Sequence, residues 1–202
     1  MSATWPPKGL TRAVADIAKG TRWTSYSGML ACREDGIAFG VYEFAGTAQF
    51  FAKPALWDRT LWRLLGMDRG EKISPTLHYR GVTVLVPPLA VERLTGRTAE
   101  AIATQLLQFA ERGLSATDPA VVGDFPALMA SSHVDRRRAD HVVAEAIWHL
   151  CEGRPDAARE IANSVVSGAR RATHSVGATP QGGGKHRTIF EVLLDELDDP
   201  TA

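Results

Sequence analysis

The sequence predicts an α+β fold in which an antiparallel sheet of four to five strands with flanking helices precedes a helical layer and a linker-tethered C-terminal helix. Three observations support this fold class. Residues 1–90 mix short alternating apolar runs with turn signals, whereas residues 91–172 follow helical periodicity. Residues 173–187 are rich in glycine and have the composition of a flexible linker, and a short amphipathic segment follows at 188–199. We expect the first two segments to pack together as one domain.

The first segment contains the expected strands. Asp35-Gly36 is a preferred pair for a two-residue β-hairpin turn, so a strand is expected on either side of it. Pro54 is a favoured first residue of a helix and closes the strand before it. The expected elements are, in chain order, a helix over 8–19, strands over 23–33, 37–44 and 49–53, a helix over 55–65 with Leu56, Trp57, Leu61, Leu64 and Leu65 on its apolar face, and a hairpin over 77–86.

The second segment, 91–172, is expected to be wholly helical. Thr98 is a suitable N-cap for a helix that should stop at Gly113. Asp118-Pro119 begins another helix, which Pro126 must interrupt. A long helix over 132–153 and its successor are separated only by Arg154-Pro155, so the two are expected to be antiparallel neighbours.

Composition limits the function classes. The chain has 202 residues, 45% of them hydrophobic, and 23 basic against 23 acidic side chains, which is typical of a globular protein and not of a disordered one. The N-terminus lacks a basic start followed by an apolar run, and the longest apolar stretch is too short to span a bilayer. Cys32 and Cys151 form no CxxC pattern and are interpreted as buried thiols. We therefore expect a cytoplasmic protein with no membrane partner.

The overall neutrality conceals a charge gradient along the chain. Residues 1–90 carry 11 basic and 7 acidic side chains, whereas residues 173–202 carry 2 and 5. Zero net charge argues against a general polyanion binder. The gradient also gives the acidic tail a reason to fold back, with its acidic residues near the basic first segment, residues 1–90.

Signatures of catalysis are missing from the sequence. There is no Gly-x-Ser-x-Gly nucleophile motif and no His-Glu-x-x-His zinc motif. His141, Glu145 and His149 recur at helical spacing, but the outer two lie too far apart along a helix to bind one ion, so they are interpreted as a solvated polar face. We expect no catalytic residue, no metal and no cofactor, although an enzyme whose site is assembled from distant residues stays a third hypothesis.

The C-terminal segment carries the most specific pattern. Thr188 and Glu191 have the spacing of a capping box at the start of a helix. The apolar face of that helix consists of Phe190, Leu193, Leu194 and Leu197. A helix of roughly ten residues is marginal alone in water, so it must dock. It either packs on its own core or binds a groove on a partner protein, and these four residues are the candidate partner-binding residues.

Two arginine clusters provide an alternative interface. Arg136, Arg137 and Arg138 lie near a helix start, and Arg170 and Arg171 lie near the end of the following helix. In an antiparallel helix pair these ends meet, so the five side chains would form one patch able to bind nucleic acid. Acidic residues are interspersed among them, which favours a salt-bridged surface instead.

The leading hypothesis is a non-enzymatic cytoplasmic protein that binds another protein, as an adaptor, an immunity-type inhibitor, a chaperone or a regulatory subunit. The motivation is the linker-tethered amphipathic helix. Deletion of residues 174–202 is then expected to abolish partner capture and leave the fold intact. The alternative is a nucleic-acid-associated protein that uses the arginine patch.

Overall fold

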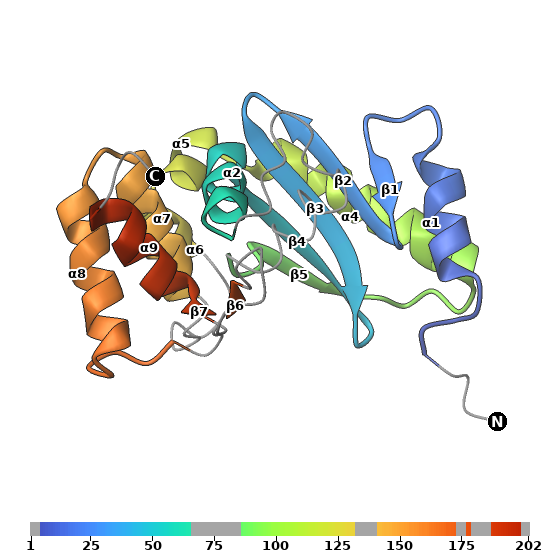
Figure 1. The fold of residues 1–202 in the computed structure, drawn as a ribbon. Coiled ribbons are helices and arrows are strands. Elements are labelled where there is room, and N and C mark those ends of the chain that lie inside the picture. Colours follow the sequence, from blue (N-terminus) through green and yellow to red (C-terminus); the bar gives the residue numbers. More distant parts are fainter. Residues whose placement is uncertain (1–4, 66–85, 132–140, 173–176, 179–186, 199–202) are drawn as a thin grey trace. The chain divides into compact units, whose positions relative to one another are not determined.

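The computed structural model describes residues 5–65, 86–131, 141–172, 177–178 and 187–198 and confirms the α+β class (Figure 1). The chain divides into two compact units. The sheet unit comprises Met1–Pro54 and Pro87–Val134, and the helical unit comprises Ala55–Val86 and Asp135–Ala202. These boundaries differ from the expected zones, because one early helix belongs to the helical unit and three later helices belong to the sheet unit.

The sheet unit is built on a five-stranded antiparallel sheet in the order β1-β2-β3-β4-β5. Its strands are β1 (Thr24–Tyr26), β2 (Met29–Glu34), β3 (Ile37–Phe44), β4 (Thr47–Pro54) and β5 (Ala90–Arg93). Two-residue turns join the first four strands, at Ser27-Gly28, Asp35-Gly36 and Ala45-Gly46. Both residues of each turn have positive φ, which is the conformation of a type I′ turn and matches the twist of the flanking strands.

Helices cover one face of this sheet. α1 (Leu10–Ala18) and α4 (Ala99–Ala116) pack on each other and on β2, and α4 also packs on β3 and β4. The core between them contains Leu30, Phe39, Val41, Phe50, Ile102 and Leu106. α5 (Pro119–Gly123) contacts β4, and α6 (Phe125–Ser131) packs on α5. Side chains of alternate strand residues therefore point into this core, and the intervening residues point to the opposite face.

The helical unit contains α2 (Ala55–Leu64), α7 (His141–Cys151), α8 (Pro155–Val166) and α9 (Ile189–Asp198). α7 packs on α2 and on α8, and α9 packs on α8 and on α2. Two short antiparallel strands, β6 (Gly177–Ala178) and β7 (Arg187–Thr188), precede α9. Residues 177, 178 and 187 of the expected linker are thus paired in strands. The rest of that linker lies outside the described residues.

Several expected elements need correction. The strand expected over 23–33 is a hairpin of β1 and β2, because Ser27-Gly28 forms a turn within it. The segment expected to be wholly helical begins with β5, which completes the sheet. α4 does not stop at Gly113 but continues to Ala116. In α2, Leu56 is exposed instead of lying on the apolar face, because it shares a helix face with the exposed Arg59 and Arg63, and Trp62 is buried on the apolar side.

Other predictions agree with the structure or lie outside its described part. Thr98 caps α4 by accepting a hydrogen bond from the Ala101 amide at 3.2 Å, and the Asp118 side chain caps α5 in the same way. Pro126 coincides with the expected interruption between α5 and α6. The hairpin expected over 77–86 lies outside the described residues except for Val86, and so does the start of the long helix before residue 141.

Candidate functional site

The N-terminus of α9 is closed by the capping box that the sequence predicts. The Thr188 amide donates a hydrogen bond to Oε2 of Glu191 at 2.6 Å, and the Glu191 amide donates one to Oγ1 of Thr188 at 3.3 Å. The bond from the Thr188 amide and, second, a bond from the Thr188 hydroxyl at 3.0 Å stabilise the ionised carboxylate and hold the pKa of Glu191 below its usual range. The helix therefore begins at a defined residue with its first amide groups satisfied.

The apolar face of α9 is turned into the helical unit. Phe190 and Leu193 are each 2% exposed, and the neighbouring Ile189 is equally buried. Leu194 and Leu197 are half-buried. Of the four predicted partner-binding residues, the structure thus places two in the core of the unit and two at its margin. The docking on its own chain that the sequence left open is the arrangement observed.

Arginine side chains hold the acidic surface of α9. Arg63 of α2 pairs with Glu196, Arg159 of α8 pairs with Asp198, and Arg187 pairs with Asp195 at 2.6 Å. Arg159 also donates a hydrogen bond to the Leu197 carbonyl at 2.8 Å. Because these pairs are largely solvent-exposed, each contributes little stability, and their effect is to orient the helix. Among these pairs, the acidic residues of α9 therefore meet the expected basic first segment only at Arg63, because Arg159 and Arg187 belong to the later segments.

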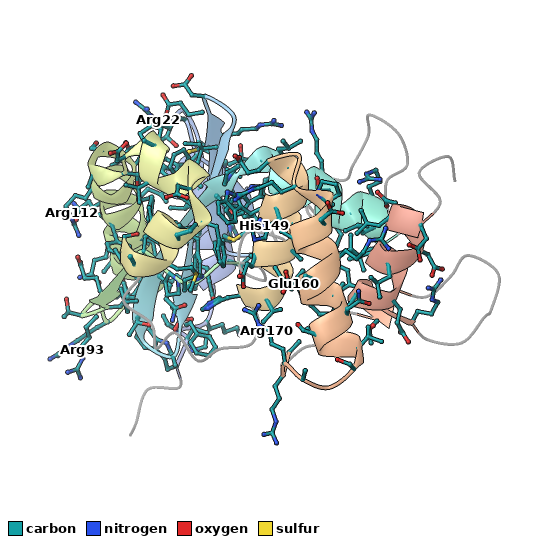
Figure 2. The ribbon with its side chains drawn as sticks, turned by 90° about the vertical axis from the view of Figure 1, so that its left-hand side faces the viewer. Arg22, Arg93, Arg112, His149, Glu160 and Arg170 are labelled. Atoms are coloured by element: carbon teal, nitrogen blue, oxygen red, sulfur yellow. The ribbon has the colours of Figure 1, made fainter. Side chains whose placement is uncertain are left out.

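The arginine patch is only partly within the described residues. Arg170, labelled in Figure 2, pairs with Glu145 at 2.5 Å, and its amide donates to the Ser164 carbonyl. Arg171 is exposed. Arg136, Arg137 and Arg138 lie outside the described residues. Arg170 is therefore part of a salt bridge, in agreement with the salt-bridged surface that the interspersed acidic residues predicted. The nucleic-acid hypothesis stays a prediction.

The polar residues of α7 do not form the solvated face that was expected. His141 is buried, and Glu145 and His149 are half-buried. The pKa of His149 is lowered, mainly by burial and secondarily by the positive charge of the nearby Arg154 guanidinium. Among the described residues, no group of three or more His, Cys, Asp or Glu side chains is arranged to hold a metal ion. In that same part of the chain, no helix combines the length and the apolarity needed to cross a membrane.

An aromatic cluster lies on the sheet face opposite α1 and α4. This outer-face cluster comprises the rings of Tyr42, Phe44 and Phe51, together with Val91, which lies on the same face across Gln49 from Tyr42. The rings of Tyr42 and Phe51 are stacked with centroids 5.4 Å apart, and the ring of Phe44 meets that of Tyr42 edge-on at 6.4 Å. Phe51 is buried, but Phe44 is 59% exposed and Val91 is 44% exposed. The cluster thus extends from the buried ring of Phe51 to the exposed apolar side chains of Phe44 and Val91.

A further exposed aromatic residue lies at the turn between β3 and β4. The indole of Trp5 donates a hydrogen bond to Oε1 of Glu43, and the same oxygen accepts one from the Gly46 amide at 2.8 Å. Trp5 is 41% exposed. Trp5 and Phe44 therefore both present apolar surface at this end of the sheet, where tryptophan and phenylalanine are typical of protein interfaces.

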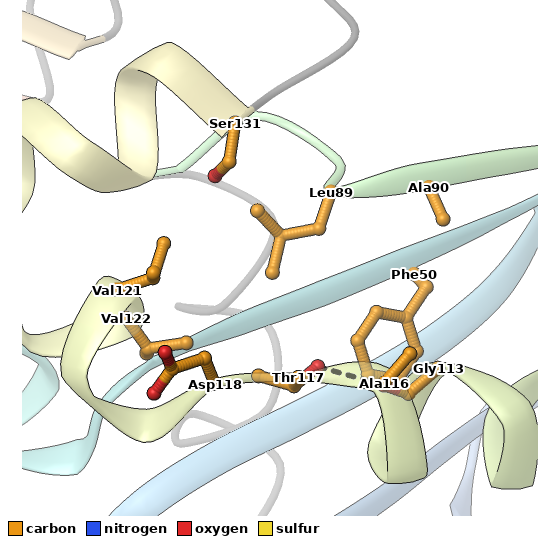
Figure 3. A pocket seen from close by; sticks show the side chains of 10 residues that line it. All are labelled: Phe50, Leu89, Ala90, Gly113, Ala116, Thr117, Asp118, Val121, Val122 and Ser131. Carbon is orange, nitrogen blue, oxygen red and sulfur yellow. Dashed lines mark hydrogen bonds between the residues drawn. The ribbon is translucent and has the colours of Figure 1, made fainter.

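An apolar cavity of about 260 Å³ opens between β4, β5 and the C-terminal end of α4 (Figure 3). Its lining includes Phe50 and Ala90 from the strands, Gly113 and Ala116 from α4, and Val121 and Val122 from α5. Space exists here because three of these residues have small side chains. At Gly113 a Cβ atom would lie 2.4 Å from the Phe50 ring, so the ring packs directly against the helix backbone.

The two thiols are free and show the properties of buried groups. Cys32 is buried in β2, and Cys151 is half-buried with its sulfur 3.5 Å from Oγ1 of Thr60. Burial raises the pKa of Cys32 to about 12 and also raises the pKa of Cys151. Both thiols are therefore protonated near neutral pH, which opposes a role as nucleophiles.

Comparison with models of protein families, with curated proteins and with solved structures finds no match to this chain. Function must therefore be argued from the surfaces described above.

Sequence reasoning missed both the outer-face cluster and the cavity. A signal for the first was present, because Tyr42 and Phe44 alternate with the core residues of β3 and must share the opposite face. Val91 was unrecognised because β5 itself was unexpected. The cavity had no sequence signal, since it is formed by residues from five elements that only the tertiary fold brings together.

Proposed function

We propose that this chain is a non-enzymatic cytoplasmic protein that binds another protein, in the role of an adaptor, inhibitor, chaperone or regulatory subunit. The observation that carries the proposal is the exposure of Phe44 and Val91 on the outer-face cluster. Single exposed apolar residues are ordinary, but the ring of Phe44 packs edge-on against Tyr42, whose ring stacks on the buried Phe51, and these contacts restrict its motion. A rigid aromatic side chain binds with little loss of conformational entropy, as residues that dominate protein interfaces do.

The C-terminal helix is the second surface that supports this role. Its apolar face is occupied within the helical unit, so Phe190 and Leu193 would meet a partner only after α9 leaves its site. Leu194 and Leu197 retain exposed surface with α9 in place. The outer-face cluster needs no such rearrangement, and it is therefore the primary candidate.

Affinity capture from a lysate of the native host tests the proposal. The full chain is compared with Phe44→Ser and Val91→Ser, which remove exposed apolar side chains from two different strands. Val166→Ser is the matched control, because Val166 is 50% exposed but belongs to α8. Proteins retained by the wild type and by the Val166 variant, and lost by both sheet variants, are the expected result. Capture that is unchanged in both sheet variants would refute the proposal.

A nuclease arm separates the two kinds of partner. If the captured material disappears after nuclease treatment and its binding weakens steeply with salt, the partner is nucleic acid and the arginine patch becomes the leading interface. If binding survives nuclease treatment and is lost in the Phe44 variant, the partner is a protein.

A further inference from the structure

We propose that the cavity between β4, β5 and α5 binds a small organic cation with an apolar body, such as an arylalkyl ammonium ion. The proposal does not depend on the protein-binding role, because the cavity opens on the core side of the sheet and the outer-face cluster lies on the opposite side. It rests on the size of the cavity, its walls and the charged side chain of Asp118 among its described lining residues.

The walls determine the body of the ligand. The apolar lining includes Phe50, Leu89, Val121 and Val122, whose side chains Figure 3 shows around the opening; Leu89 and Val121 are half-buried, whereas Phe50 and Val122 are buried. Apolar cavities of about 150 Å³ bind a single benzene ring, whereas pockets for drug-sized ligands begin near 300 Å³. A volume of about 260 Å³ therefore fits one ring with a short chain.

The polar groups determine the ligand's other end. The hydroxyl of Thr117 donates to the Gly113 carbonyl at 2.7 Å, and that of Ser131 donates to the Leu128 carbonyl at 2.9 Å. Both hydroxyl protons are therefore already used within the protein. Asp118 is different, because only its Oδ1 is engaged, by the Ala120 amide at 2.9 Å.

Among the described residues that line this cavity, Asp118 is the only charged one. A carboxylate can accept about four hydrogen bonds, so capacity remains for a donor on the ligand. An ammonium group supplies hydrogen-bond donors and a charge opposite to that of Asp118. A carboxylate on the ligand would instead be repelled by Asp118. Since Asp118 is exposed, water screens the attraction, and the preference for a cation over a neutral analogue is expected to be only roughly two- to fivefold.

The test uses three probes with the same phenylethyl body on the full chain: 2-phenylethylammonium, the neutral 2-phenylethanol and the anionic 3-phenylpropanoate. Dissociation constants are measured by protein-observed NMR titration, in the millimolar range typical of such small ligands. The expected order of affinity is ammonium, then alcohol, then carboxylate. Absence of binding by all three probes, or equal binding of the ammonium and the carboxylate, would overturn the proposal.

Four variants locate the site. Asp118→Asn keeps a good helix cap but removes the charge, so it should equalise the ammonium and the alcohol. Asp124→Asn removes a nearby exposed carboxylate outside the lining and should change nothing. Ala116→Leu and Ala90→Leu fill the cavity from opposite walls, and each should weaken both probes at least tenfold while far-UV circular dichroism stays native. Retained binding in both filled variants, or a retained ammonium preference in Asp118→Asn, would place the ligand elsewhere and refute the site.

Discussion

Replacement of Phe190 by alanine measures how firmly the C-terminal helix is docked. The phenyl ring is 2% exposed and lies among the largest fully buried side chains of the chain. Truncation of such a ring removes its buried apolar surface and leaves a cavity, at a cost of about 3–5 kcal/mol. The ion pairs made by Arg63 and Arg159 are exposed and offset little of this loss. We therefore expect Phe190→Ala to release α9 from the helical unit.

Hydrogen exchange followed by mass spectrometry is the suitable assay, because it reports on one helix at a time. A loss of about 3 kcal/mol corresponds to a roughly 150-fold rise in the exchange of amides in residues 187–198. The matched control is Phe44→Ala, the same substitution at a ring that is 59% exposed, and it should change stability by less than about 0.5 kcal/mol.

The reasoning is refuted if exchange in α9 rises less than about threefold in Phe190→Ala. That result would mean that α9 is not docked on its own chain in solution. The four apolar residues of α9 would then be available to a partner, as the alternative interpretation of the sequence requires. A large rise, accompanied by an unchanged sheet unit, would instead assign α9 to the core of the helical unit.

Three further predictions concern single residues. Gly113→Ala places a methyl group against the Phe50 ring and should lower the free energy of unfolding by about 1–3 kcal/mol, measured by chemical denaturation; an unchanged midpoint would contradict the close packing. Because the capping hydrogen bonds lower the pKa of Glu191, its stabilisation is present above the ordinary glutamate pKa and is lost as pH falls through the lower folded value. An NMR titration of α9 should show this acid transition, and Glu191→Gln should abolish it. With its pKa raised to about 12, Cys32 should resist alkylation by iodoacetamide at pH 8 until the chain is unfolded, and rapid labelling of the native protein would argue against burial of the thiol.

The hairpins and caps were the most predictable parts of the fold because their causes are local. Asp35-Gly36 adopts the left-handed backbone at both positions, and the strands expected on either side pair across it. Likewise, Thr188 and Glu191 satisfy each other's amides within four residues. Such interactions need no distant partner, so a pattern of neighbouring residues is enough to predict them.

The errors occurred where a distant partner decides the local structure. Gly113 has the residue type that ends helices, yet α4 continues through it because the missing side chain lets the Phe50 ring approach. β5 has only four residues and a weak strand pattern, and its pairing with β4 makes it a strand. Leu56 is apolar but exposed, because it lies with Arg59 and Arg63 on the face of α2 that is not packed.

The sequence by itself determined the α+β class, three of the local caps and the amphipathic character of the C-terminal helix. These depend on periodicity, on turn chemistry and on hydrogen bonds between near neighbours. Only the tertiary structure decided that Phe190 and Leu193 are buried within their own chain and that Phe44 stays exposed. An apolar side chain gains the same free energy from any apolar surface that excludes water, so its sequence pattern shows that it must be buried but not against what.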